Sequence, residues 1–209
     1  MINGEPVYNM KIGIFGGSFN PIHYGHLVLA EHARDAAGLD RVILIPAYES
    51  PFKRGTGGES SIHNLNMTRL AAEGNPNLEV SSMEVDRGEL SYTVDTMRKI
   101  SEKCGPDDRL YFIMGADSFF SLEHWMGAEE LLRSYSFVVA RRPGCEAGKI
   151  EETADWLRRK YGADIIIVPV PQVEISSTDI RERFHSGRSV RYLTPDSVID
   201  YVTSHGLYR

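Results

Sequence analysis

The sequence predicts an α/β fold in which helices cover both faces of a parallel sheet. Two patterns carry this prediction: short apolar runs rich in β-branched residues recur along the chain, and stretches with helical periodicity lie between them. Consecutive parallel strands need a crossover connection, usually a helix, so this alternation is typical of βαβ units. Most of the apolar runs lack regular polar positions, as do strands buried on both faces.

Six of the apolar runs are predicted strands, at residues 11–16, 41–47, 78–82, 109–115, 136–142 and 164–170. Three stretches between them carry apolar residues at helical spacing, at 24–38, 92–105 and 151–162. Each of these stretches ends at a glycine, the residue that most often terminates a helix. The segment 48–61 combines proline with glycines and serines, which favours a mobile loop. The predicted fold is therefore a Rossmann-like, doubly wound parallel sheet.

The last part of the chain predicts a short helical C-terminal segment. Helices are expected over 176–187 and 194–206, and each is followed or ended by glycine. Thr194 is the predicted N-cap of the second helix, and Pro195 is its predicted first residue.

We expect one domain over residues 11–209, in which 176–209 forms the helical C-terminal part that packs on the sheet. Residues 1–10 are mostly polar and contain glycine and proline, so they are expected to be a disordered lead-in without a signal peptide.

The composition restricts the classes of function. A hydrophobic fraction of 42% and a charged fraction of 25% are typical of a soluble globular protein. The net charge of −6 argues against a nucleic-acid partner. Apolar runs of about 18 residues are absent, so no membrane span is expected. The two cysteines fit neither a disulfide framework nor zinc spacing, which predicts reduced thiols in a cytoplasmic protein. The sequence leaves open whether homo-oligomers form.

The stretch GGSFNPIHYGH (16–26) joins the first predicted strand to the first predicted helix. In an open parallel sheet, ligands bind beyond the carboxyl ends of the strands, where the strand order reverses. Gly16 and Gly17 have no Cβ, so the backbone can approach a ligand closely there. The helix start that follows favours an anion. The pattern is neither the Walker nor the dinucleotide form, because Asn20 and Pro21 replace the further glycine of the latter.

His23 and His26 lie three residues apart in the first turn of this helix, so both imidazoles can point at one phosphate. The alternatives are two solvated histidines or half of a metal site. The strand–glycine turn–helix context favours phosphate, and no cysteine or third histidine lies near enough in the sequence to suggest zinc. The other histidines, His124 among them, are expected at the surface or at helix caps.

These motifs resemble a known family. GGSFNPIHYGH resembles the T/HxGH signature of the nucleotidyltransferase superfamily, and ISSTDIR (175–181) resembles its ISSTxIR motif. Three further segments are similar to nicotinate-mononucleotide adenylyltransferases: LSYTVDTM (90–97), FIMGADSFFSLEHW (112–125) and VRYLTPDSVIDYV (190–202). Such enzymes make deamido-NAD from nicotinate mononucleotide and ATP. The resemblance covers residues 11–208.

The resemblance implies a role for each matching residue. The glycine turn and the histidines would hold the ATP phosphates through Gly16, Gly17, Ser18, Phe19, His23 and His26. The second signature would bind the triphosphate side through Ser176, Ser177, Thr178 and Arg181. The mononucleotide would contact Lys53 (phosphate), Tyr92 and Thr93 (nicotinate carboxylate), Gly115 and Asp117 (ribose) and Trp125 (pyridine ring). The residues expected to be catalytic are His23, His26 and Arg181.

The chain departs from the family pattern at one place. The helix after the 48–61 loop usually has an arginine in its first turn, where this chain has Asn64 and Asn66. Arg69 lies about a turn later and cannot simply replace it. This segment is therefore left out of the predicted site.

Adenylyl transfer fits a site of this composition. One phosphate attacks the α-phosphorus of ATP in line, and negative charge builds up on the leaving pyrophosphate. The attacking phosphate is already ionised at neutral pH, so neither a general base nor a covalent intermediate is needed. Positioning and cationic donors carry the catalysis. A Mg²⁺ ion that bridges ATP oxygens is expected, held mostly by substrate and water.

Other readings of the same motifs compete. Pantetheine-phosphate adenylyltransferases and cytidylyltransferases share the HxGH logic but lack the GADSF…W and SYTVDT segments. A nucleotide-binding module without turnover is disfavoured by the intact His23, His26 and Arg181. A fragment of an RNA-charging synthetase is disfavoured by the short, acidic chain. The sequence therefore predicts adenylyl transfer from ATP to nicotinate mononucleotide.

Overall fold

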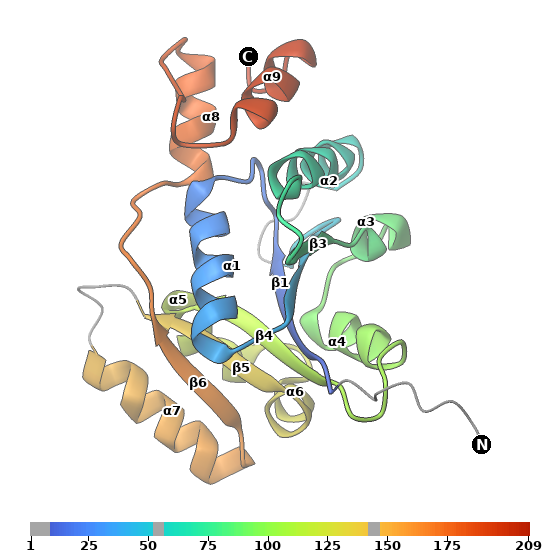
Figure 1. The fold of residues 1–209 in the computed structure, drawn as a ribbon, viewed down its shortest axis with the longest axis vertical. Coiled ribbons are helices and arrows are strands. Elements are labelled where there is room, and N and C mark those ends of the chain that lie inside the picture. Colours follow the sequence, from blue (N-terminus) through green and yellow to red (C-terminus); the bar gives the residue numbers. More distant parts are fainter. Residues whose placement is uncertain (1–8, 52–56, 142–146) are drawn as a thin grey trace.

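The computed structural model describes residues 9–51, 57–141 and 147–209 (Figure 1). Its centre is a six-stranded sheet with the order β3-β2-β1-β4-β5-β6, in which every neighbouring pair is parallel. The strands are β1 (Lys11–Gly17), β2 (Arg41–Pro46), β3 (Leu78–Val80), β4 (Arg109–Gly115), β5 (Ser136–Arg141) and β6 (Asp164–Pro169). The six predicted strands and the predicted Rossmann-like α/β fold are confirmed.

The strand order reverses between β1 and β4. From β1 the sheet continues through β2 to β3 on one side, and from β4 it continues through β5 to β6 on the other. β1 pairs with β2 as far as Gly17 and Pro46, but its pairing with β4 ends at Ile14 and Phe112. The two central strands are therefore unpaired with each other toward their carboxyl ends. This is the position at which open α/β sheets bind ligands.

The sheet is buried on both faces, which explains the lack of polar alternation in its strands. Along β4, Phe112 and Met114 belong to one apolar cluster, and Tyr111 and Ile113 belong to the other. The first cluster includes residues of α4 (Thr93–Ser101), α6 (Ala128–Ser134) and α7 (Ala147–Tyr161). The second includes residues of α1 (Tyr24–Ala37), α2 (Glu59–Ala72) and α9 (Asp196–Ser204), so helices cover both faces (Figure 1).

Several elements were not anticipated from the sequence. They are the short elements α3 (Met83–Arg87), α5 (Ala116–Phe120) and the 3₁₀ helix η1 (Leu122–His124), together with α6, whereas α2 was expected from the family resemblance and not from periodicity. The buried side of α2 includes the polar residues Ser61, Asn64 and Thr68, which interrupt the apolar stripe that periodicity relies on. The predicted loop over 48–61 is wrong at its end, because α2 begins at Glu59; residues 52–56 lie outside the described part of the chain.

Two of the predicted helices have different ends in the structure. α1 ends as expected, because Gly38 has φ 61° and its N–H donates to carbonyls of the last turn. α4 ends at Ser101 rather than at Gly105, whose N–H instead donates to Asp108 Oδ2 at 2.8 Å in the turn before β4. α7 begins at Ala147, earlier than predicted.

The C-terminal segment is helical as predicted, with one correction at a helix cap. α8 spans Ser177–His185, and the Ser176 hydroxyl oxygen accepts the Asp179 N–H at 3.1 Å, as an N-cap does. Thr194 is not the N-cap of α9, because Pro195 holds that position. The Thr194 hydroxyl is buried and donates to the carbonyl of Ile22 at 2.7 Å. Thr194 thus joins the C-terminal segment to the turn after β1.

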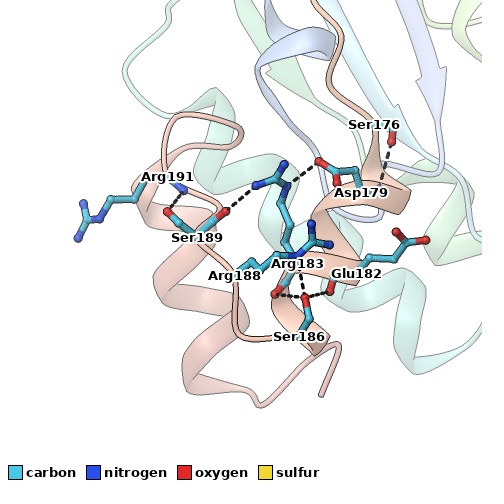
Figure 2. A network of polar contacts seen from close by, with 8 residues as sticks. All are labelled: Ser176, Asp179, Glu182, Arg183, Ser186, Arg188, Ser189 and Arg191. Carbon is cyan, nitrogen blue, oxygen red and sulfur yellow. Dashed lines mark hydrogen bonds and ion pairs between the residues drawn. The ribbon is translucent and has the colours of Figure 1, made fainter.

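Arg183 fixes the connection between α8 and α9 (Figure 2). Its Nε donates to Asp179 Oδ2 at 2.7 Å within α8, and its Nη1 donates to the Ser189 carbonyl at 3.3 Å beyond the helix. Arg188 adds a bond from Nε to the Ser186 hydroxyl at 2.9 Å. The chain after α8 is therefore folded back along the helix by side-chain bonds.

The start of the described chain is joined to the sheet. The Met10 N–H donates to Asp108 Oδ1 at 3.0 Å, and the Met10 carbonyl accepts the Arg109 N–H at 2.8 Å. Met10 is the last residue of the predicted lead-in, and residues 1–8 of that lead-in lie outside the described part of the chain. None of the described helices combines the length and apolar character needed to cross a membrane.

Candidate active site

A cavity of about 550 Å³ opens where β1 and β4 cease to pair, and Ile14 and Phe112 both line it. This volume lies within the range of sites for small molecules and cofactors. Six residues predicted from the sequence also form its wall: Gly16, Gly17, Ser18, Tyr92, Thr93 and Trp125. The structure therefore brings the glycine turn, the SYT segment (residues 91–93) and Trp125 to one cavity.

The glycine turn is shaped by close packing. A Cβ on Gly17 would lie 3.0 Å from the Phe19 ring, whereas Gly16 has more room. Phe19 has φ 44°, a left-handed conformation that is rare for an aromatic residue, and it is buried. Its ring packs edge-on against His26, with the centroids 5.1 Å apart. The Phe19 side chain therefore supports a histidine and is not part of the cavity wall.

The two histidines lie together at the start of α1. His23 is the buried N-cap residue, and His26 is in the first turn. Their rings stack with centroids 3.7 Å apart, and the His23 backbone N–H donates to His26 Nδ1 at 3.3 Å. Because Nδ1 accepts this bond, a neutral His26 ring carries its hydrogen on Nε2. The pair thus presents an imidazole donor at the positive end of a helix dipole.

The second signature meets the first at the turn between β1 and α1. The Ser177 hydroxyl donates to the carbonyl of Pro21 at 2.9 Å, and Arg181 Nη1 donates to the carbonyl of Asn20 at 2.8 Å. Arg181 Nη2 also donates to the Thr178 hydroxyl at 3.3 Å. Ser177 and Arg181 therefore bind the backbone of the histidine-bearing turn.

The SYT segment begins α4 at the cavity wall. Tyr92 is its N-cap residue and Thr93 its first helical residue, so the N–H groups at the helix start, which have no partner within the helix itself, lie beside the cavity. The preceding residue is fixed by two bonds: the Ser91 N–H donates to the carbonyl of Glu49, and the Ser91 hydroxyl accepts the Tyr48 N–H at 3.2 Å. This helix start is a suitable binding point for a carboxylate.

Trp125 contributes an aromatic wall. Its ring meets Phe112 edge-on, with centroids 5.9 Å apart at 83°, and its Nε1 donates to the Ser121 hydroxyl at 3.2 Å. These contacts fix the indole plane for stacking against a flat ligand. His124 is exposed, as expected of a surface residue, and it also lines the cavity.

Some predicted residues are not part of the cavity wall. Gly115 ends β4 and caps α5, and Asp117 is exposed in the first turn of that helix, next to Ser118, which does line the cavity. Lys53 lies outside the described residues. Asn64 is buried in α2, and its Oδ1 has no hydrogen-bond partner in the part of the chain that the structure describes.

Glu84 is a buried wall residue that sequence reasoning missed. Its Oε1 accepts the Thr96 hydroxyl, so the carboxyl joins α3 to α4. Burial raises the pKa of Glu84, and this effect is opposed by hydrogen bonds from Thr96 and Ser91 and by the charge of Arg87. The sequence signal points to its partner and not to Glu84 itself: Thr96 lies four residues after Tyr92, on the same helical face as the predicted site.

The fold and these motifs define a nucleotidyltransferase. Residues 14–183 match the family model described as cytidylyltransferase-like. A relative from Thermoanaerobacter sp. (strain X514), named "Probable nicotinate-nucleotide adenylyltransferase", is 44% identical over 96% of this chain and 95% of its own length. A relative of the same name from Moorella thermoacetica is 42% identical over 95% of this chain and 92% of its own. The chain belongs to the nicotinate-nucleotide adenylyltransferase family.

Solved structures share the fold. The nicotinic acid mononucleotide adenylyltransferase of Plasmodium falciparum complexed with NaAD aligns with a TM-score of 0.77 at 19% identity, covering 95% of this chain and 97% of that chain. The complex of the same enzyme with APC aligns with a TM-score of 0.74 over the same shares. At this identity the likeness concerns the fold alone.

Proposed function

We propose that this protein transfers the adenylyl group of ATP to nicotinate mononucleotide, giving deamido-NAD and pyrophosphate in NAD biosynthesis. One observation carries the proposal: α8 bonds the turn that presents His23 and His26, next to a cavity lined by Tyr92 and Trp125. Family membership supports the same reaction. The protein would work on small nucleotides in the cytoplasm, without a nucleic-acid or membrane partner.

The ATP phosphates would lie at the start of α1. His23, His26 and Arg181 would be the catalytic groups, because each offers an N–H donor where negative charge builds up in the transition state. Backbone groups of the glycine turn would help to bind the triphosphate. The remaining proposed ATP contacts are Gly16, Gly17, Ser18, Phe19, Ser176, Ser177 and Thr178.

The mononucleotide would occupy the cavity. Its pyridine ring would stack on Trp125, and its carboxylate would bind the start of α4 at Tyr92 and Thr93. Its phosphate would attack the α-phosphorus of ATP in line, without a covalent enzyme intermediate. Lys53, Gly115 and Asp117 remain proposed contacts to the phosphate and ribose.

A Mg²⁺ ion would accompany ATP and neutralise charge on the phosphate oxygens. The protein groups fit an ion held by substrate and water rather than by a protein cage. Within the described residues, no three His, Cys, Asp or Glu side chains come together as a metal site. Glu84 is the carboxylate of the described cavity wall, and its Oε1 already accepts a hydroxyl hydrogen.

Pyrophosphate release from ATP and nicotinate mononucleotide tests the proposal directly. We expect turnover that requires both nucleotides and that stops when EDTA removes Mg²⁺. Parallel reactions with phosphopantetheine, and with CTP in place of ATP, test the sister activities. The proposal would be refuted by turnover with phosphopantetheine or with CTP if ATP and nicotinate mononucleotide together gave none. Binding of ATP without any turnover would point instead to a nucleotide-binding module.

The stereochemistry tests the direct transfer. Each in-line displacement inverts phosphorus, so one displacement inverts the α-phosphorus of an ATP analogue made chiral with sulfur, and a covalent route through two displacements retains its configuration. We expect inversion. Retention would show that an adenylyl-enzyme forms.

A further inference from the structure

The turn between the glycine pair and the histidines is bonded at three successive carbonyls by the C-terminal segment. Asn20 O accepts from Arg181, Pro21 O accepts from Ser177, and Ile22 O accepts from Thr194, at 2.8, 2.9 and 2.7 Å. The carbonyls of this short stretch lie outside any helix or strand, and residues far along the chain supply their hydrogen-bond donors. Its position decides where His23 and His26 lie.

Tyr208 adds a fourth bond from the same segment, to a side chain of the turn. Its hydroxyl donates to Asn20 Oδ1. Its ring lies 6.0 Å from that of Phe184 in α8, measured between centroids. Burial raises the pKa of Tyr208 well above its usual range, so the hydroxyl keeps its hydrogen and remains a donor at physiological pH.

The backbone conformation after α9 determines the direction of the Tyr208 side chain. Gly206 has φ 63°, and the Leu207 N–H donates to the carbonyl of Val202 at 3.0 Å, which turns the chain back at the end of α9. Tyr208 itself has φ 63°, a conformation that is unfavourable for an aromatic residue. Such a conformation persists only where surrounding contacts hold it, and strained residues of this kind cluster at functional sites.

Arg181 and Tyr208 bond different atoms of Asn20, the carbonyl and the side-chain amide oxygen. In the proposed function, Arg181 also binds ATP phosphate, so its guanidinium must serve two partners. A second and independent bond to Asn20 keeps the turn in place while Arg181 engages the nucleotide.

We infer that Tyr208 is a positioning residue of the adenylyl-transfer site: through Asn20, its hydroxyl holds the turn that presents His23 and His26 to ATP. This inference rests on the proposed function for its kinetic readout. It extends the site to Tyr208, beyond the end of α9, which none of the signature motifs includes.

Tyr208→Phe tests the inference, because it removes the hydroxyl and keeps the ring against Phe184. We expect kcat/KM for ATP to fall about five- to tenfold, as for the loss of one hydrogen bond, with KM for nicotinate mononucleotide within twofold of wild type. Tyr201→Phe is the matched control. Its hydroxyl lies 2.9 Å from His63 Nδ1 and accepts from Asn66 Nδ2 at 3.0 Å, away from the turn. An equal kinetic loss in both variants, or none in Tyr208→Phe, would overturn the inference.

A double-mutant cycle locates the effect. With Asn20→Ala, Tyr208→Phe and the double variant, we expect the double variant to be no worse than Asn20→Ala alone, because both remove the same bond. Fully additive losses would show that Tyr208 acts elsewhere.

Hydrogen–deuterium exchange separates this inference from the proposed function. Amides within residues 16–26 should exchange faster in Tyr208→Phe than in wild type or Tyr201→Phe, whatever reaction the protein catalyses. An inactive wild type with this exchange pattern would refute the proposed function alone. Unchanged exchange in Tyr208→Phe would refute the inference alone.

Discussion

At the scale of single residues, His26 is held by hydrogen bonding and by packing together. Its Nδ1 accepts the His23 N–H, and its ring stacks on the His23 imidazole and lies nearly perpendicular to the Phe19 ring. These contacts fix both the tautomer and the plane of the ring. Nε2 is therefore the donor that a phosphate would meet.

We expect His26→Ala to be folded and nearly inactive. Loss of one donor that stabilises transition-state charge typically costs about 10²–10³ in rate. His32→Ala, an exposed residue of the same helix, is the control and should keep wild-type turnover. Steady-state kinetics decide the matter, and turnover of His26→Ala within about threefold of wild type would remove His26 from the phosphate site.

We expect Arg181→Lys to be damaging as well. The planar guanidinium bonds Asn20 O and Thr178 Oγ1 through two separate nitrogens, and a lysine ammonium is a point charge that cannot reproduce that fork. kcat/KM for ATP should fall at least tenfold, whereas Arg188→Lys, at an exposed position after α8, should have little effect. Unchanged kinetics with ATP would make Arg181 a purely structural residue.

At the scale of elements, Glu84 connects α3 to the helix start that would bind the nicotinate carboxylate. The bond from Thr96 reaches across from α4 to α3, and both residues line the cavity. The connection places a carboxyl group in an environment that disfavours its charge.

This environment predicts a pH-dependent stability. Burial raises the pKa of Glu84 in the folded state, so its contribution favours folding at low pH and is lost as the pH rises through that raised pKa. Glu84→Gln stays neutral with nearly the same shape. Its free energy of unfolding should therefore exceed that of wild type at about pH 7.5, with a smaller difference at about pH 4. Urea unfolding at both pH values measures this, with the exposed Glu89→Gln as control. If Glu84→Gln differed from wild type by the same free energy at both pH values, the raised pKa of Glu84 would be contradicted.

The start of α4 predicts the choice between two mononucleotides. Nicotinate carries a carboxylate where nicotinamide carries an amide, and unpaired N–H groups at a helix start favour the anion. Hydrogen bonds to a charged acceptor contribute about 1.5–3 kcal/mol against about 1 for neutral ones. We expect kcat/KM for nicotinate mononucleotide to be at least tenfold higher than kcat/KM for nicotinamide mononucleotide, measured at the same ATP concentration. Stacking on Trp125 contributes nearly equally to the binding of both rings. Equal kcat/KM values for the two mononucleotides would therefore place the ring carboxylate away from Tyr92 and Thr93.

At the scale of the whole molecule, the parts that periodicity controls were predictable and the long-range polar bonds were not. Apolar strand patterns predicted the sheet, and six of the residues named from the resemblance line the cavity. The role of Glu84 was missed because a buried carboxyl looks like any surface glutamate in a sequence. Thr194 was misassigned for a related reason: a threonine before proline and aspartate has the local pattern of an N-cap, but its hydroxyl instead bonds Ile22, far away in the sequence.

Thr194 gives a test of whether the two ends of the chain form one cooperative domain. Thr194→Val keeps the shape of the side chain but leaves the buried carbonyl of Ile22 without this donor. We expect a loss of about 1–3 kcal/mol in the free energy of unfolding, in a single transition that far-UV circular dichroism and tryptophan fluorescence report at the same urea concentration. Thr203→Val is the control, because that hydroxyl is exposed and donates to a carbonyl of its own helix, Ile199 O. Two separated transitions, in wild type or variant, would show that residues 176–209 unfold independently of the sheet. An equal loss in the two variants would show that the bond to Ile22 contributes no more than an exposed hydroxyl does.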